Sequence, residues 1–181
     1  KDVRVFVPQI AMSAGTMIAL SSKEIVMGKQ SNLGPIDPQF GGMSCAGIIE
    51  EFNEACRDVK ANPAMANVWG PIISKYHPTF IGDCKKAMAW ADTTVNKWLT
   101  ENMFSAYDDA EARAKKVVDA LSSHNATYSH SRHIHMDELV NLGLDIVRLE
   151  GLDDRQIDDC KDLQDCVLTI HHSFMQTLSS T

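Results

Sequence analysis

The residues best suited to chemistry lie in the stretch MSAGT, residues 12–16, where a serine stands among small side chains. The preceding run, Val3–Val7, is β-branched and ends at Pro8, which predicts a buried strand, and residues 14–22 have helical character. A serine at such a strand-to-helix turn projects its hydroxyl, and the amides that open the helix can face an oxyanion. Ser13 is therefore a candidate nucleophile, although a serine that only caps the helix gives the same pattern.

Three histidines, His130, His133 and His135, form a second candidate cluster. Their HxxHxH spacing suggests a zinc site, but the run spans a loop and a helix start, whereas zinc ligands usually share one face of a regular element. We therefore predict no bound metal. His130 could instead serve as a general base, and a loop histidine without a function is the commonest case.

The acidic composition excludes several classes of partner. The chain has 181 residues, with 17 Lys and Arg against 24 Asp and Glu, so its formal net charge is −7. This balance opposes contact with phosphate backbones, and we predict no nucleic-acid partner. No apolar run of about 18 residues is present, so we predict no membrane span. The five cysteines form no CxxC pair, which favours reduced thiols and a cytoplasmic protein. Because GxGxxG, P-loop and HExxH motifs are absent, we predict no cofactor.

The spacing of apolar residues predicts the elements that must position Ser13. A second short strand, Glu24–Met27, follows the first helix, and residues 31–42 are rich in Gly and Pro and are predicted to be a loop. The remainder is mostly helical, and we expect a single α/β domain over residues 1–181. Helices are expected at residues 45–62 with Ser44 as N-cap, at 64–76 with a break at Gly70-Pro71, at 80–103, 108–122, 136–144 and 156–178, and a strand at 145–149.

Two stretches resemble a known family. Residues 5–39, VFVPQIAMSAGTMIALSSKEIVMGKQSNLGPIDPQ, and residues 135–144, HMDELVNLGL, resemble the serine dehydrogenase proteinase family. That family is similar to the Clp protease subunit and signal peptide peptidase A groups. The resemblance implies an α/β Clp/crotonase-like fold with a helix-rich C-terminal part. It also implies that the family's N-terminal strands, with one of two oxyanion donors, precede Lys1, so we expect an N-terminally truncated domain.

The resemblance assigns roles to individual residues. Ser13 falls on the nucleophile, and the backbone N–H of Ala14 falls on one oxyanion donor. The Clp-type catalytic histidine would fall near Asp37 and the Clp-type aspartate near Ser131, so neither residue type is retained. Asp37 is interpreted either as a residue that positions the base or the substrate, or as a cap of its own proline-flanked turn.

A serine nucleophile needs a base, and the signal peptide peptidase A group uses a lysine that follows the serine by several dozen residues. The candidates here are Lys60, Lys75, Lys85 and Lys86. We favour Lys75, because it lies in the irregular stretch 70–78, where partial burial would lower the pKa of its ammonium group. The alternative is that each lysine is an ordinary surface charge.

These residues together predict a serine peptidase that hydrolyses peptide bonds through an acyl-enzyme on Ser13, with a Ser/Lys dyad. Two alternatives stay open: a catalytically inert scaffold of the same fold that binds a peptide or protein, and a crotonase-like acyl-CoA enzyme. The expected partners are a peptide or protein substrate and further copies of the chain, because the apolar stripe in residues 80–103 suits a core or a subunit interface. No pyridoxal phosphate is inferred, and membrane contact is expected only through segments outside this sequence.

Overall fold

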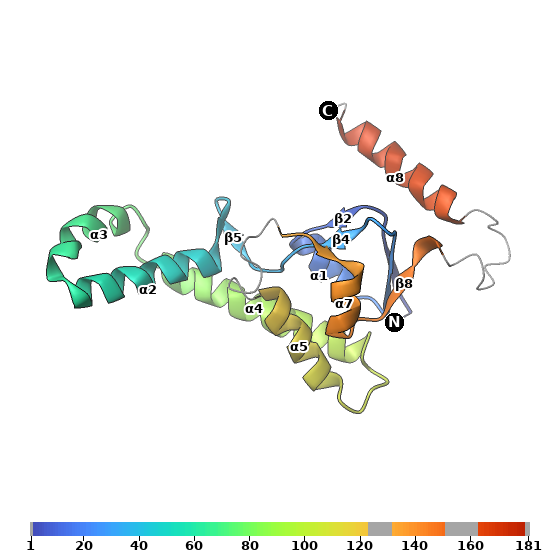
Figure 1. Ribbon diagram of the computed structural model, residues 1–181, viewed down its shortest axis with the longest axis horizontal. Helices are drawn as coiled ribbons and strands as arrows, with labels where there is room; N and C mark the ends of the chain where they lie inside the picture. The colour runs from blue at the N-terminus through green and yellow to red at the C-terminus, as the bar shows by residue number, and fades with distance from the viewer. Residues whose placement is uncertain (1, 123–131, 151–162, 180–181) are drawn as a thin grey trace.

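The computed structural model describes residues 2–122, 132–150 and 163–179 (Figure 1). We distinguish two parts, an arm and a body. The arm comprises residues 45–88 and is helical. The body comprises the described residues before 45 and those from 89 to 150, and it holds the strands. A final helix, α8 (Leu163–Ser179), follows the body.

Three parallel strands form the first sheet of the body, in the order β1 (Arg4–Val7), β3 (Glu24–Met27) and β8 (Ile146–Arg148). Val and Ile dominate these strands, and their branched side chains pack well on a pleated surface. In this register Val26 lies opposite Phe6. All three strands confirm the sequence-based prediction.

A second sheet was not predicted. It has the order β2 (Ile10–Ala11), β4 (Asn32–Leu33) and β7 (Ile134–His135), with β2 parallel to β4 and β4 antiparallel to β7. Part of the expected loop 31–42 is therefore paired as β4. Two-residue strands such as these show no periodicity in the sequence, because they exist only through pairing with distant segments.

The same expected loop ends in a hairpin. Strand β5 (Gln39–Phe40) pairs with β6 (Met43–Ser44), and the two residues between them, Gly41 and Gly42, have φ angles of 57° and 81°. Positive φ at both central residues is the geometry of a tight hairpin turn, which glycine adopts without steric cost. The hairpin projects the chain from the body into the arm (Figure 1).

The main core lies in the body, between the sheets and the helices. Helix α1 (Ala14–Leu20) contributes Ala19 and Leu20, both fully buried. Helices α5 (Ala110–Ser122) and α7 (Met136–Leu142) supply further apolar side chains. The residues that close this core share almost complete burial and include Ile25, Met27, Leu33, Ile36, Val95, Leu99, Phe104, Val117, Leu121, Ile134 and Leu139.

The arm begins with α2 (Cys45–Ala61), whose predicted N-cap is confirmed. The Ser44 hydroxyl accepts a hydrogen bond from the N–H of Gly47 at 3.2 Å. The helix ends at Asn62, as expected from the proline that follows it.

The rest of the arm is the broken segment that the sequence predicted. A short 3₁₀ turn, η1 (Pro63–Met65), leads into α3 (Ala66–Ile73), which contains Pro71. Helix α4 (Phe80–Glu101) then returns from the arm into the body. No residue of α3 is buried, although its sequence, ANVWGPII, is mostly apolar.

Helix α8 contacts the body through its amino-terminal half. Leu163 and Val167 pack against the buried pair Val26 and Leu149. No helix within residues 2–122, 132–150 and 163–179 is long and apolar enough to span a membrane.

Candidate active site

Ser13 lies between β2 and α1 with an unusual backbone. Its φ and ψ angles are 51° and −115°, and among the described residues only Ser13 and three glycines have positive φ. A non-glycine residue in such a region is strained, and strained residues of this kind cluster at functional sites. The half-buried Ser13 side chain makes no capping hydrogen bond with α1. Ser13 therefore stands at the N-cap position without capping the helix through its side chain, and its hydroxyl is available for another role.

The backbone around Ser13 leaves amides at the start of α1 without a backbone acceptor, and that of Ala14 is among them. The N–H of Gly15 donates to the carbonyl of Met12 at 2.8 Å. The N–H of Met17 donates to the carbonyl of Ser13 at 3.0 Å. No described residue accepts a hydrogen bond from the N–H of Ala14, which is an exposed residue. This amide follows the serine directly, which is where an oxyanion donor is needed.

Thr16 fixes the position of this turn, and the sequence analysis did not identify it. Its fully buried hydroxyl donates to the carbonyl of Ala11 at 2.8 Å and accepts from the N–H of Gly34 at 3.2 Å. The same Gly34 N–H also approaches the Ala11 carbonyl at 2.8 Å. One side chain thus joins the end of β2, the start of α1 and the loop after β4. The only signal in the sequence is a hydroxyl residue placed one helical turn after Ser13.

Gly34 allows this loop to lie directly against the Ser13 turn. A Cβ atom at position 34 would come within 2.3 Å of the Met12 sulfur and 3.3 Å of the Met12 Cα. Any side chain there would displace Met12, the residue next to Ser13. The LGPIDPQ motif is therefore packed on the serine turn.

Asp37 lies three residues further along this loop and is only 2% exposed. Burial of this degree argues against direct contact between Asp37 and a substrate. Its carboxylate acts electrostatically on Cys45, at the start of the arm. Burial, the hydrogen bond with Cys84, and the charges of Cys84 and Asp37 together raise the pKa of the Cys45 thiol to about 12. Asp37 therefore links the serine loop to the base of the arm.

The four candidate lysines all lie on the arm and are exposed. Lys60 ends α2, Lys75 lies in the turn between α3 and α4, and Lys85 and Lys86 belong to the first turns of α4. The expected partial burial of Lys75 is wrong, because α3 continues through Pro71 and the following turn lies on the surface. Within one chain the structure does not bring Lys75 to Ser13, which lies in the body (Figure 1).

The histidine cluster is only partly described. His130 and Ser131 lie outside the described residues. His133 and His135 are exposed, and His135 belongs to β7. Within the described ranges, no group of three or more His, Cys, Asp or Glu side chains is arranged to hold a metal ion.

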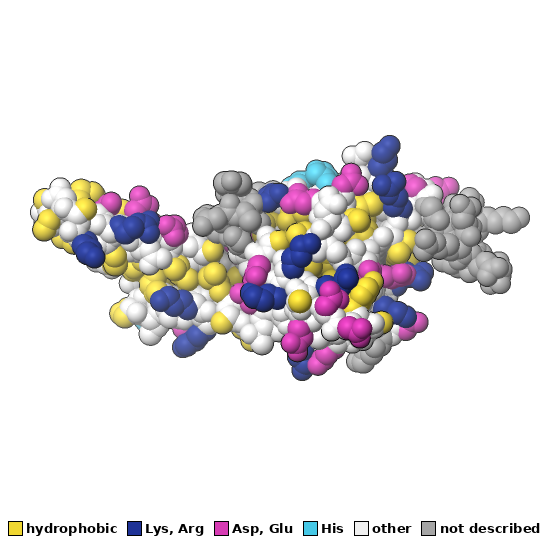
Figure 2. All heavy atoms as spheres, turned by 60° about the horizontal axis from the view of Figure 1, so that its bottom comes forward, with side chains coloured by type: hydrophobic (Ala, Val, Ile, Leu, Met, Phe, Trp, Pro, Cys, Tyr) yellow, Lys and Arg dark blue, Asp and Glu magenta, His cyan; other side chains and the backbone are white. Residues whose placement is uncertain are grey.

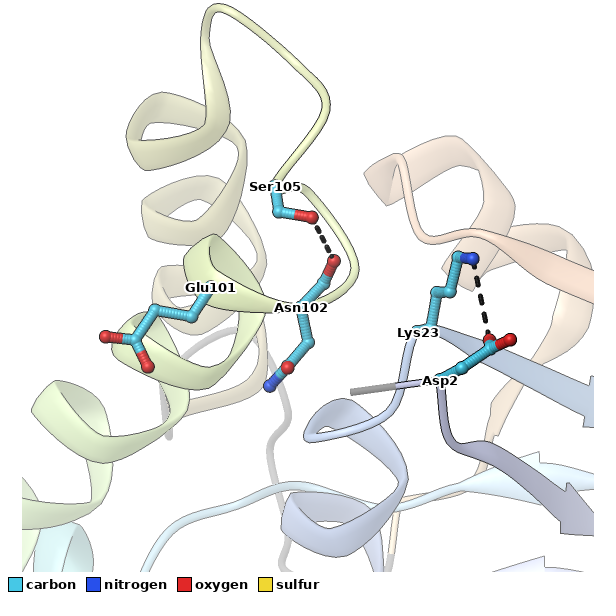
Figure 3. Close-up of a pocket in the computed structure, with 5 residues that line it drawn as sticks. All are labelled: Asp2, Lys23, Glu101, Asn102 and Ser105. Carbon is cyan, nitrogen blue, oxygen red and sulfur yellow. Dashed lines mark hydrogen bonds and ion pairs between the residues drawn. The ribbon is translucent and has the colours of Figure 1, made fainter.

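A polar pocket of about 270 Å³ has no residue of the serine turn in its lining (Figure 3). Lys23 and Asp2 line it at the amino ends of β3 and β1, and their charged groups approach each other at 3.5 Å. Asn102 and Ser105 line the opposite side, where the Ser105 hydroxyl donates to the Asn102 carbonyl at 2.8 Å. Ligands of α/β sheets bind at the carboxyl ends of the strands, so this pocket is not the candidate active site.

Comparison with known protein families identifies the family of this chain. Residues 1–150 match the family described as ClpP-like SDH-type serine proteinase. The chain belongs to this family. The matched region contains the Ser13 turn and the arm and ends before α8. The mixed α/β architecture is consistent with a ClpP-like proteinase.

Two curated relatives of this chain come from Methanocaldococcus jannaschii. The uncharacterized protein MJ1495 is 28% identical over 142 residues, which are 78% of this chain and 41% of that protein. The uncharacterized protein MJ0137 is 27% identical over 146 residues, which are 80% of this chain and 43% of that protein. The chain thus spans about two fifths of the length of these relatives. No solved structure is significantly similar to it.

Proposed function

We propose that this chain carries the nucleophile of a serine peptidase with a Clp/crotonase-like fold. The Ser13 hydroxyl attacks the carbonyl carbon of a peptide bond, the amine leaves with a proton, and water then hydrolyses the acyl-enzyme. The backbone of Ser13 carries this proposal, because a strained serine without a capping bond is the expected form of a nucleophile at a strand-to-helix turn.

The other site residues take supporting roles. The Ala14 N–H donates to the developing oxyanion, and Thr16 and Gly34 hold the turn in place. Asp37 positions the loop at the base of the arm. It is not a group that contacts the substrate, since it is buried.

The proposed Ser/Lys dyad requires two copies of the chain to associate. Because Lys75 lies on the arm and Ser13 in the body, a dyad of these two residues requires the lysine of a second copy of the chain. Replacement of Lys75 by Gln tests this role, with Lys97→Gln as the matched control, an exposed lysine of α4 that is not a candidate base. A loss of peptidase activity at pH 7 in the Lys75 variant alone supports the dyad. Equal peptidase activity in the two variants rejects it.

Labelling with a fluorophosphonate, read by intact mass, tests the nucleophile directly. We expect one adduct on the wild-type chain, no adduct on Ser13→Ala, and an unchanged adduct on Ser105→Ala, which removes an exposed serine of the body. An adduct that persists in Ser13→Ala would overturn the proposal.

The inert scaffold is the second candidate function. It is favoured by the observation that the four candidate lysines lie on the arm whereas Ser13 lies in the body. The family resemblance also implies that the Clp-type histidine would fall near Asp37, where that residue type is not retained. An absence of any adduct on the folded wild-type chain, together with peptide binding that Ser13→Ala leaves unchanged, would favour the scaffold.

A further inference from the structure

Helix α8 carries an apolar stripe that its own body covers only in part. Leu163 and Val167 are packed against the first sheet, but the stripe continues on the same face beyond the body. There, Ile170, Phe174 and Met175 are 58%, 64% and 47% exposed. The spacing i, i+4, i+7, i+11 between residues 163, 167, 170 and 174 is that of one face of an α-helix, which is a typical recognition surface.

The described part of α8 is also poor in charge. After Asp165 it contains no Lys, Arg, Asp or Glu up to residue 179. A helix that is meant to face water on all sides normally carries charged residues. This composition is typical of a segment whose face is covered by another apolar surface.

The arm carries an apolar groove between α2 and α3. The groove has a volume of about 480 Å³, and Ala55 and Val59 line it from α2, and Trp69 and Ile73 from α3. The indole N–H of Trp69 donates to the carboxylate of Asp58 at 3.1 Å, which fixes the distance between the two helices. Apolar side chains gather along the arm (Figure 2). Only one charged residue, Lys60, lines the groove, so an uncharged helix face suits it.

The groove and the stripe lie in different halves of the molecule. Helix α3 lies at one end of the long axis, and α8 lies beyond the body in the other half (Figure 1). Contacts of Leu163 and Val167, and the approach of the His171 ring to the Gln9 side chain at 3.1 Å, hold α8 to its own body. One chain therefore cannot seat its own α8 in its own groove.

We propose that the exposed part of the α8 stripe docks into the α2–α3 groove of a second copy of the chain. Each copy then offers one helix and one groove, so the contact is head-to-tail and joins different surfaces of the two copies. Such contacts build a ring when the rotation closes and a filament when it does not. Residues 163–179 lie outside the region that matches the family, so the proposed contact rests on the residues of this chain and not on the family match.

Light scattering of the full chain from about 1 µM to about 100 µM tests the association. We expect the mass of the wild type to increase with concentration. Phe174→Asp removes the stripe and is expected to give a monomer, as is Ala66→Asp at the groove, where an acidic residue suits the first turn of α3. Thr169→Asp, about 140° away from Phe174 around α8, and Asn67→Asp, in the same turn as Ala66, are the matched controls and keep the wild-type mass.

A mixture of the two monomeric variants distinguishes this contact from other assemblies. The Phe174→Asp chain keeps an intact groove, and the Ala66→Asp chain keeps an intact stripe, so the mixture is expected to form 1:1 pairs and nothing larger. A monomeric wild type at all concentrations, a wild-type mass in Ala66→Asp, or a mixture that stays monomeric would each overturn the proposal. Circular dichroism confirms that each variant is folded.

Discussion

The body and the arm differ in how they bury apolar side chains. Every fully buried member of the main core belongs to the body, where sheets and helices close on both sides. The arm has a small cluster of its own, in which only Cys45, Ile48 and Cys84 are buried. Its helix α3 buries no residue at all.

This difference indicates a division of work between the two parts. A strained backbone such as that of Ser13 persists only where surrounding contacts over-determine it, and the body provides those contacts. The arm offers fewer such contacts, because its own cluster has only three buried residues. Exposed apolar side chains occur in both parts, for example Ile18 and Trp90 in the body and Val68 in the arm. The body therefore supplies the packing that can hold a strained site, whereas the arm does not.

Truncation of one isoleucine in each part gives the largest expected difference. Ile25 in β3 is fully buried, so Ile25→Ala should reduce the free energy of unfolding by about 2–5 kcal/mol. Ile72 in α3 is 36% exposed and outside the groove lining, so Ile72→Ala should change it by less than about 1 kcal/mol. Denaturant unfolding measures both variants. Equal losses of unfolding free energy would show that the arm is packed as firmly as the body. The proposed difference between the two parts would then be wrong.

The body is also the part that the sequence predicted best. The branched residues of β1 and β3 revealed two strands, and a serine among small residues revealed the Ser13 turn. Local composition decides such features. The second sheet, the bonds of Thr16 and the contact between Gly34 and Met12 were missed, because each depends on segments that meet only in the folded chain.

The sequence predicted the helices of the arm, but it did not predict how exposed the side chains of the arm are. The Ser44 cap and the break after Asn62 follow from residue types that act locally. The burial of Lys75 does not follow from any local pattern, since it depends on whether another element covers the turn after α3. In the described structure none does, and Lys75 is exposed.

The junction of arm and body should respond to pH through Cys45. The folded thiol has a pKa of about 12, compared with 9.0 for an unperturbed thiol, so between these values the unfolded chain loses its proton first. Stability is therefore retained below about pH 9 and should fall as the pH rises towards 12, by up to about 1.4 kcal/mol per pH unit. The measurement compares unfolding of the wild type and Cys45→Ala at about pH 8 and about pH 10.

The alanine variant provides the reference for this pH dependence. Tyrosines and lysines also titrate above pH 9, but their contribution is common to both proteins, so the difference reports the Cys45 thiol together with its interaction with Cys84. A smaller loss of stability with pH in Cys45→Ala than in the wild type is expected. Identical pH dependence in the two proteins would show that the junction does not protect this thiol.

Thr16→Val tests the body at the level of a single hydroxyl. The variant keeps the volume of the side chain and loses the bonds to the Ala11 carbonyl and the Gly34 N–H. We expect a loss of about 1–1.5 kcal/mol of stability, because those two backbone groups still bond to each other. Labelling of Ser13 should slow as well, whereas Thr16→Ser should preserve both properties. Unchanged labelling in the valine variant would show that Thr16 does not position the serine.

Ser44→Ala gives the smallest effect and tests where the arm begins. The hydroxyl accepts a single bond from the Gly47 N–H at 3.2 Å, and loss of an N-cap usually costs about 0.5–2 kcal/mol. We expect a value near the lower limit, since the next turn of α2 is partly exposed. Hydrogen exchange should show faster opening of α2 with no change in α1 or β3, because the main core and the cluster of the arm have no buried residue in common. If exchange accelerated equally in α1, the two parts would unfold as one cooperative unit, and the division between a rigid site and a separately stabilised arm would be wrong.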